Sequence, residues 1–155
     1  MDGFVRGRLR VAGSDATRAT LALYDQLGRN DVNAIMISGS VLSLYNVLDI
    51  DQVHSELKVP VLALSFSKST SNLAENISER FPEKIAWEKI ELLDKLGRAS
   101  RLKLATGYDI FVRSAGISDV SSKRLLDRFT LQGGVPEPVR VARLLAKSMA
   151  TLPER

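Results

Sequence analysis

Two polar residues stand where strands of this 155-residue chain are predicted to end. Asp15 follows an alternating segment, 4–11, and Ser38 follows a short apolar segment, 34–37. Ligands of open α/β sheets collect beyond the carboxyl ends of the strands, so we expect both side chains at one site. A Mg²⁺ ion there would require two or three carboxylates, and only Asp15 carries one. The spacing also suits Asp15 as the N-cap of the following helix, and it favours that simpler interpretation.

Basic residues form a second group with a chemical role, because they contact the phosphates of nucleic acids. The chain has 22 Lys and Arg against 18 Asp and Glu, a net charge of +4, and the basic excess lies in residues 98–155. The candidate contacts are Arg6, Arg8, Arg10, Lys68 and Arg140. Each has an alternative role. The three N-terminal arginines could keep a strand edge from pairing, and Lys68 could lie in a solvated loop. Arg140 could anchor the last helix to a carboxylate in the core.

Residue counts exclude several kinds of site. The chain has no cysteine, which excludes thiol nucleophiles, iron–sulfur clusters and cysteine-bound zinc. His54 is the only histidine, and we expect it to be an ordinary surface or packing residue. Apolar runs fall well short of the roughly 20 residues of a membrane span, and the N-terminus lacks a signal-peptide core. These features predict a cytoplasmic protein without a membrane partner.

The order of elements predicts one α/β layered domain over residues 1–155. The apolar segment 59–66 is typical of a strand covered on both faces. We expect Asp49 or Asp51 to cap a short helix in the crossover 41–57. Trp87 and Tyr24 lie at helical spacing among apolar neighbours and are predicted to be core residues. The other expected elements are helices at 16–27, 73–81, 84–96, 119–129 and 136–149, and a hairpin of strands at 101–105 and 110–114.

Three motifs, in this order, resemble one known family. They are GSDAT at 13–17, IMISG at 35–39 with Asn46 downstream, and AGIS at 115–118 followed by PEPVR at 136–140. Over residues 3–150 the chain resembles the archaeal proteins of domain of unknown function 99, also called endonuclease dU, which are relatives of endonuclease V. The resemblance implies a ribonuclease H-like fold with a mixed sheet flanked by helices. Its structural motif residues here are Gly39, Asn46, Gly116, Pro136, Glu137 and Pro138.

The same resemblance implies Mg²⁺ as a cofactor and cleavage of a phosphodiester near a deaminated base. Asp15 corresponds to an acidic residue of the family and would be catalytic and metal-ligating. Ser38 stands where the family has a catalytic Asp, and Ala115 where endonuclease V has a histidine. The family's first-strand Asp has no counterpart, because the chain begins after that point. The expected domain is therefore N-terminally short, with an open sheet edge that invites a second copy of the chain.

Two functions from different classes follow. The first is a Mg²⁺-dependent endonuclease acting on deaminated or otherwise modified nucleic acid, impaired here because carboxylate ligands are missing. The second is a non-catalytic module on the same scaffold that binds nucleic acid or a protein partner. Serine is a poor substitute for a carboxylate ligand of Mg²⁺, which favours the second function for this chain, whereas the resemblance favours the first.

Overall fold

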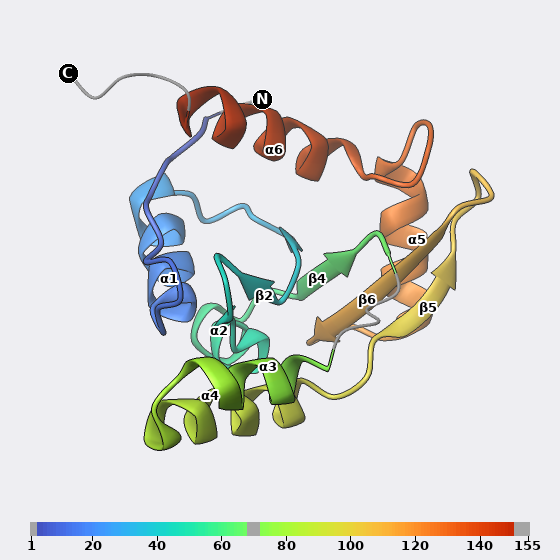
Figure 1. Ribbon diagram of the computed structural model, residues 1–155. Coiled ribbons are helices and arrows are strands. Elements are labelled where there is room, and N and C mark those ends of the chain that lie inside the picture. The colour runs from blue at the N-terminus through green and yellow to red at the C-terminus, as the bar shows by residue number, and fades with distance from the viewer. Residues whose placement is uncertain (1–2, 68–71, 151–155) are drawn as a thin grey trace.

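The computed structural model describes residues 3–67 and 72–150, and the candidate contact Lys68 lies outside them. Figure 1 shows a sheet surrounded by helices, which confirms the predicted α/β fold with a mixed sheet. The helices are α1 (Ala16–Leu27), α2 (Ile50–Leu57), α3 (Leu73–Arg80), α4 (Glu83–Leu96), α5 (Asp119–Phe129) and α6 (Glu137–Ala150). The strands are β1 (Ile35–Ser38), β2 (Val41–Leu42), β3 (Asn46–Val47), β4 (Val61–Ser65), β5 (Ser100–Lys103) and β6 (Asp109–Ala115).

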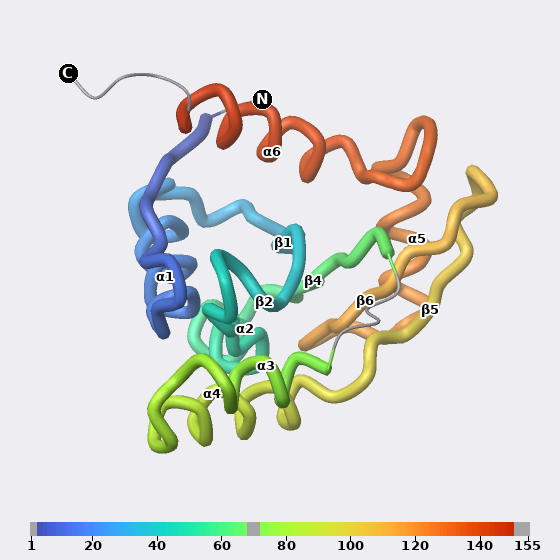
Figure 2. Tube along the Cα trace, viewed as in Figure 1, coloured from blue at the N-terminus to red at the C-terminus, as the bar shows by residue number. Residues whose placement is uncertain are grey.

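The main sheet has the strand order β1-β4-β6-β5. β1 pairs in parallel with β4, whereas β6 pairs antiparallel with both β4 and β5. The predicted hairpin is therefore confirmed as β5 and β6. β1 and β5 form the two edges of this sheet, and the course of the chain through it can be followed in Figure 2. No strand of the described residues pairs with the outer edge of β1, and assembly of two copies at this edge stays a prediction.

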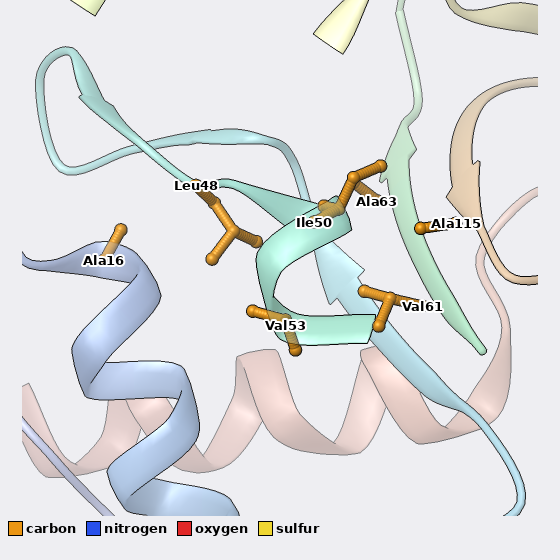
Figure 3. Packing of buried hydrophobic residues seen from close by; sticks show 7 residues of the cluster. All are labelled: Ala16, Leu48, Ile50, Val53, Val61, Ala63 and Ala115. Atoms are coloured by element: carbon orange, nitrogen blue, oxygen red, sulfur yellow. The ribbon is translucent and has the colours of Figure 1, made fainter. Parts of the chain in front are cut away.

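The side chains of β4 enter two hydrophobic clusters, because neighbouring residues of a strand point to opposite faces of the sheet. Val61 and Ala63 join the cluster on the face covered by α1 and α2. Figure 3 shows this cluster, which also contains Ala16, Leu48, Ile50, Val53 and Ala115. Leu62 and Leu64 join the other cluster, with Leu126 of α5 and Val139 of α6. β4 is thus covered on both faces, as its apolar sequence predicts.

The prediction of a strand at 4–11 is wrong. The segment pairs with no strand of the described residues and packs instead along α1. A Cβ atom on Gly3 would lie 3.8 Å from Leu27 Cδ1, and one on Gly7 would lie 3.1 Å from Leu23 Cδ2. The alternation itself is retained, because these odd-numbered positions face the helix and the even-numbered arginines are exposed.

Helix ends confirm two predicted caps. Gly28 closes α1 in the left-handed region, with φ of 63°. The carboxylate of Asp49 caps α2 by accepting the N–H of Gln52 at 2.9 Å. Among the described residues, no helix combines the length and the apolar character needed to cross a membrane.

The prediction that Trp87 belongs to the core is wrong, because its side chain is 63% exposed. The buried stripe of α4 runs through Ala86 and Lys89, and Trp87 lies off that stripe. Tyr24 of α1 is partly buried. The helical spacing of Trp87 therefore pointed to a side of α4 that is not buried.

His54 is a packing residue, as predicted. Its Nδ1 lies 2.9 Å from the carbonyl oxygen of Val59. The ring covers Gly116 so closely that a Cβ atom there would lie 2.1 Å from His54 Cε1. Gly116 also has φ of 73°, in the left-handed region that costs other residues roughly 1–2 kcal/mol. Gly116 therefore allows the end of β6 to meet α2.

We expect Gly116→Ala to destabilise the protein by roughly 2–5 kcal/mol, because the methyl group must displace His54 in addition to straining the backbone. Gly28→Ala is the matched control, since Gly28 has a similar φ and no atom within 4 Å of its Cβ position. It should cost only about 1–2 kcal/mol. Urea unfolding measures both variants. If both variants lost the same free energy of unfolding, the contact with His54 would not be what restricts residue 116 to glycine.

Candidate functional site

The side-chain amide of Asn46 is fully buried where three parts of the chain meet. Its Oδ1 accepts the N–H of Ala16 at 3.0 Å. Its Nδ2 donates to the carbonyl of Arg10 at 3.1 Å and to Oδ1 of Asp15 at 2.6 Å. One side chain of β3 thus joins the end of the N-terminal segment to the start of α1.

Asp15 occupies the N-cap position of α1, but its side chain does not cap the helix. Its oxygens accept from Asn46 and lie 3.4 Å from the N–H of Arg10. The hydrogen bond from Asn46 is the main cause that lowers the pKa of Asp15. The N-cap prediction is therefore right about the position and wrong about the hydrogen bond, because the Asp15 side chain accepts no N–H of the first turn. The N–H of Ala16, at the start of α1, is accepted by Asn46 Oδ1.

Lys89 of α4 packs against the same junction and is only 3% exposed. Its ammonium donates to the carbonyl oxygens of Gly13 and Tyr45, the second at 2.9 Å. Burial lowers the pKa of Lys89, and the negative charge of Asp15 opposes that shift. Ala12 and Tyr45, in the two turns concerned, have φ of 57° and 63°. Lys89 therefore holds together two turns with left-handed backbone.

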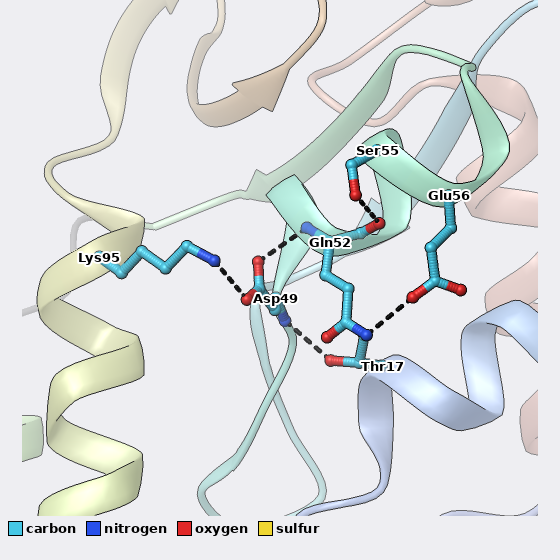
Figure 4. Close-up of polar contacts among 6 residues, drawn as sticks. All are labelled: Thr17, Asp49, Gln52, Ser55, Glu56 and Lys95. Carbon is cyan, nitrogen blue, oxygen red and sulfur yellow. Dashed lines mark hydrogen bonds and ion pairs between the residues drawn. The ribbon is translucent and has the colours of Figure 1, made fainter.

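Asp49 joins α1, α2 and α4, as Figure 4 shows. Its backbone N–H donates to Thr17 Oγ1 at 3.0 Å, and its carboxylate accepts the ammonium of Lys95 at 2.6 Å. Burial raises the pKa of Asp49, but the hydrogen bonds from Lys95 and the N–H of Gln52 outweigh burial, so the pKa is lowered. This carboxylate is ionised and fully engaged in holding the helices together.

The junction around Asp15 does not fit Mg²⁺. This ion requires six oxygen ligands in a nearly ideal octahedron, whereas the Asp15 carboxylate is occupied by N–H donors. Lys89 adds a positive charge that interacts with Asp15. Within 3–67 and 72–150, no group of three His, Cys, Asp or Glu is placed to hold a metal ion. Ser38 is exposed at the end of β1, and the catalytic roles of Asp15 and Ser38 stay predictions.

The candidate nucleic-acid contacts lie on two separate elements. Arg6, Arg8 and Arg10 are exposed on the N-terminal segment. Arg140 lies in the first turn of α6 and forms an ion pair with Glu137 of the same turn. This pair lies within α6 and does not anchor the helix to a carboxylate in the core, which was the alternative role expected for Arg140.

The remaining motif residues shape turns. Gly39, with φ of 95°, donates its N–H to the carbonyl of Leu64 at 2.8 Å and so ends β1 against β4. Pro136 is buried immediately before α6, and Pro138 is exposed in its first turn. Oε1 of Glu137 is buried without a partner among the described residues. The structural role of these motif residues stays a prediction.

Sequence reasoning missed Lys89 and Lys95. A lysine in an amphipathic helix ordinarily points to solvent, and the partners of these two lie 44 to 76 positions away in the chain. One weak signal in the sequence was that Lys89 follows Ala86 by three residues. This spacing puts both residues on one side of the helix, so a buried Ala86 indicates a buried Lys89.

Comparisons of the sequence with known proteins found a matching family model and archaeal relatives. The model of the Endonuclease dU family matches residues 1–150. The UPF0215 proteins of Pyrobaculum aerophilum and Pyrobaculum calidifontis are 32% and 33% identical over 138 and 140 residues. These matches cover 88% and 90% of this chain and 72% and 75% of the two relatives.

A solved structure shows the same fold. A protein of unknown function from Archaeoglobus fulgidus matches with a TM-score of 0.76 and 23% identity, over 91% of this chain and 78% of that chain. Endonuclease V of Ciona intestinalis, in complex with a DNA that contains an inosine, gives a TM-score of 0.48 and 10% identity, over 86% of this chain and 61% of that chain.

We expect Asn46→Ala to destabilise the protein by about 2–4 kcal/mol, because the buried N–H of Ala16 loses its partner. The pKa of Asp15 should rise toward its usual value, which NMR titration of the carboxyl carbon measures. Because the pKa of Asp15 is lower in the folded state than its unfolded-state value of about 3.9, ionised Asp15 stabilises the fold above that value. This stabilisation is lost as the pH falls through the folded-state pKa of Asp15. The variant should therefore lose less stability on acidification than the original chain.

Asn33→Ala is the control for this prediction, because Asn33 is exposed and its side chain makes a single hydrogen bond, to the carbonyl of Asp31. It should leave both the stability and the pKa of Asp15 nearly unchanged. If the pKa of Asp15 stayed low in Asn46→Ala, the lowering would have another cause than the Asn46 amide.

Proposed function

Because this chain belongs to the Endonuclease dU family, we propose that it binds nucleic acid through the outer side of its N-terminal segment. The four side chains concerned, Phe4, Arg6, Arg8 and Arg10, are called here the arginine face. The observation that carries the proposal is their exposure along one extended stretch, while the alternate positions Gly3 and Gly7 pack against α1. The helix thus supports the segment from behind, and the side chains of Arg6 and Arg10 are exposed to solvent.

The spacing of the arginine face suits a phosphate backbone. Residues two apart in an extended chain are separated by about 6.6 Å, and the phosphates of one DNA strand follow each other at about 3.4 Å along the helix axis. Successive arginines are therefore far enough apart to contact different phosphates of one strand. Phe4 is 52% exposed on the same side and offers a ring on which an unpaired base can stack. Contacts of this kind bind nucleic acid with little regard to sequence.

The geometry supports binding better than hydrolysis. The family name implies an endonuclease, and Mg²⁺ is the cofactor that the sequence resemblance implies. Yet the carboxylate of Asp15 accepts the amide of Asn46 at 2.6 Å, and Lys89 supplies a positive charge to the same junction. A divalent ion would have to displace these partners. We therefore assign this chain the role of a nucleic-acid-binding module. The competing function is cleavage of deaminated nucleic acid, and a cleavage assay distinguishes the two.

We expect binding to oligonucleotides to weaken steeply with salt, because each phosphate contact releases counterions. The double variant Arg6→Gln/Arg10→Gln should lower the slope of log K against log salt by about 1.8 on duplex DNA and by about 1.4 on single strands. Fluorescence anisotropy between roughly 50 and 200 mM salt measures both slopes.

The matched control is Arg124→Gln/Arg128→Gln, which removes the same charge from exposed positions of α5. Its slope should equal that of the original chain. Equal slopes for both double variants would locate binding elsewhere on the molecule, and no binding at any salt would reject the proposed function.

We expect the chain to leave DNA that contains deoxyuridine or deoxyinosine uncut in the presence of Mg²⁺, since Asp15 is the single charged ligand carried over by resemblance. Ser38→Asp should tighten Mg²⁺ binding in calorimetry and restore little cleavage. Asp25→Ala, at an exposed position of α1, controls for Asp15→Ala. Metal-dependent cutting by the original chain that only Asp15→Ala abolishes would establish the endonuclease instead.

A further inference from the structure

Two adjoining cavities form a groove along α4. Their volumes are about 480 and 370 Å³, and both are lined by Glu88 and Leu92 of that helix. Leu21 of α1 and Val47 of β3 line the larger cavity, and Glu91 of α4 lines the smaller one. Val47 is buried, and the two leucines are partly buried. The groove thus combines apolar side chains in its walls with carboxylates along α4.

The rim of this groove on α4 is acidic. Glu88 and Glu91 are exposed, and neither has a hydrogen bond or ion pair with another described residue. Lys95 lies on the same rim, but its ammonium is bound to the carboxylate of Asp49. An exposed cation, Arg18, lines the wall that α1 forms. The α4 rim therefore favours a positively charged partner and disfavours phosphates.

Helix α6 carries the complementary chemistry on its exposed side. Val141 and Leu144 are 40% and 61% exposed, and their spacing of three residues places them on one side of the helix. Arg143 and Lys147 are exposed beside them, four residues apart. The guanidinium of Arg143 lies 5.4 Å from the centre of the Phe66 ring, which holds it at the surface. This side of α6 is therefore both apolar and basic, a pattern typical of helices that dock in grooves of other proteins.

The two surfaces also agree in spacing. Glu88 and Glu91 are three residues apart, which is about 4.5 Å along the axis of α4. Arg143 and Lys147 are four residues apart, which is about 6 Å along the axis of α6. The long side chains of arginine and lysine can span this difference, so each cation can reach one carboxylate. Leu144 follows Arg143 directly and would enter the apolar part of the groove, where its burial stabilises the contact.

These two surfaces do not meet within one molecule, because Figure 1 shows α6 and α4 at opposite ends with the main sheet between them. We propose that copies of this chain associate head to tail, with α6 of one copy docked in the groove between α1 and α4 of the next. Such an interface is heterologous, since each copy offers its groove to one neighbour and its α6 to another. The proposal uses neither the arginine face nor the edge of β1, so it does not rest on the proposed function.

Sedimentation velocity of the whole chain between about 1 μM and 1 mM tests the proposal. We expect association that increases with protein concentration and weakens with salt, because salt screens the charges of the rim. The groove variant Glu88→Lys/Glu91→Lys and the α6 variant Leu144→Ser should each weaken association about tenfold or more. The matched controls are Glu79→Lys/Asp94→Lys and Leu131→Ser, all at exposed positions outside both surfaces. The controls should associate as the original chain does.

A mixture of the groove variant and the α6 variant tests the head-to-tail arrangement directly. The groove variant keeps the original α6, and the α6 variant keeps the original groove, so the mixture should form complexes of two chains and stop there. The proposal is overturned if the original chain does not associate at about 1 mM, if either variant associates as strongly as the original chain, or if the mixture stays monomeric. Association that persists in both variants would place the contact at another surface, such as the edge of β1.

Discussion

The buried amide of Asn46 is the interaction on which the N-terminal half of this structure depends. It is fully buried, and both its nitrogen and its oxygen are hydrogen-bonded to groups 30 to 36 positions earlier in the chain. A buried polar group without partners would cost about 1–3 kcal/mol, so the N-terminal segment and the start of α1 are held where they satisfy this amide. The extended course of the segment along α1, and with it the exposure of its arginines, follows from this anchor.

The same anchor determines what Asp15 does. Its carboxylate accepts the amide of Asn46, and α4 supplies compensating charge through Lys89. Lys95 does the same for Asp49 one turn and a half further along α4. Two lysines of α4 therefore balance the charges of two carboxylates, those of Asp15 and Asp49. Acidic residues balanced in this way stabilise the fold, and they are poorly prepared to hold a divalent ion.

Local physics made much of the fold predictable. The apolar run of β4 and the cap residues Gly28 and Asp49 depend on neighbours in sequence, and the structure confirms each of them. The segment 4–11 shows where such prediction fails. Alternation of apolar and polar residues determines which side chains share a face, but a strand also requires a hydrogen-bonded partner strand. Trp87 shows a second limit, because an amphipathic pattern does not say which of two apolar stripes meets the sheet. Lys89 shows a third, because its partners are distant in sequence.

Helix α1 lies between the N-terminal segment and a cavity that residues of α2 and α4 also line. One side of α1 supports the arginine face through the contacts of Gly3 and Gly7, and the other side forms a wall of the cavity with Arg18 and Leu21. Both surfaces are fixed relative to the sheet, because Ala16 at the start of α1 is bonded to Asn46 and Thr17 to Asp49. The arginine face and the cavity are thus built on one helix, which two hydrogen bonds that involve side chains hold in place. Neither of these hydrogen bonds involves Ser38, so the position of α1 does not depend on the residue at the end of β1.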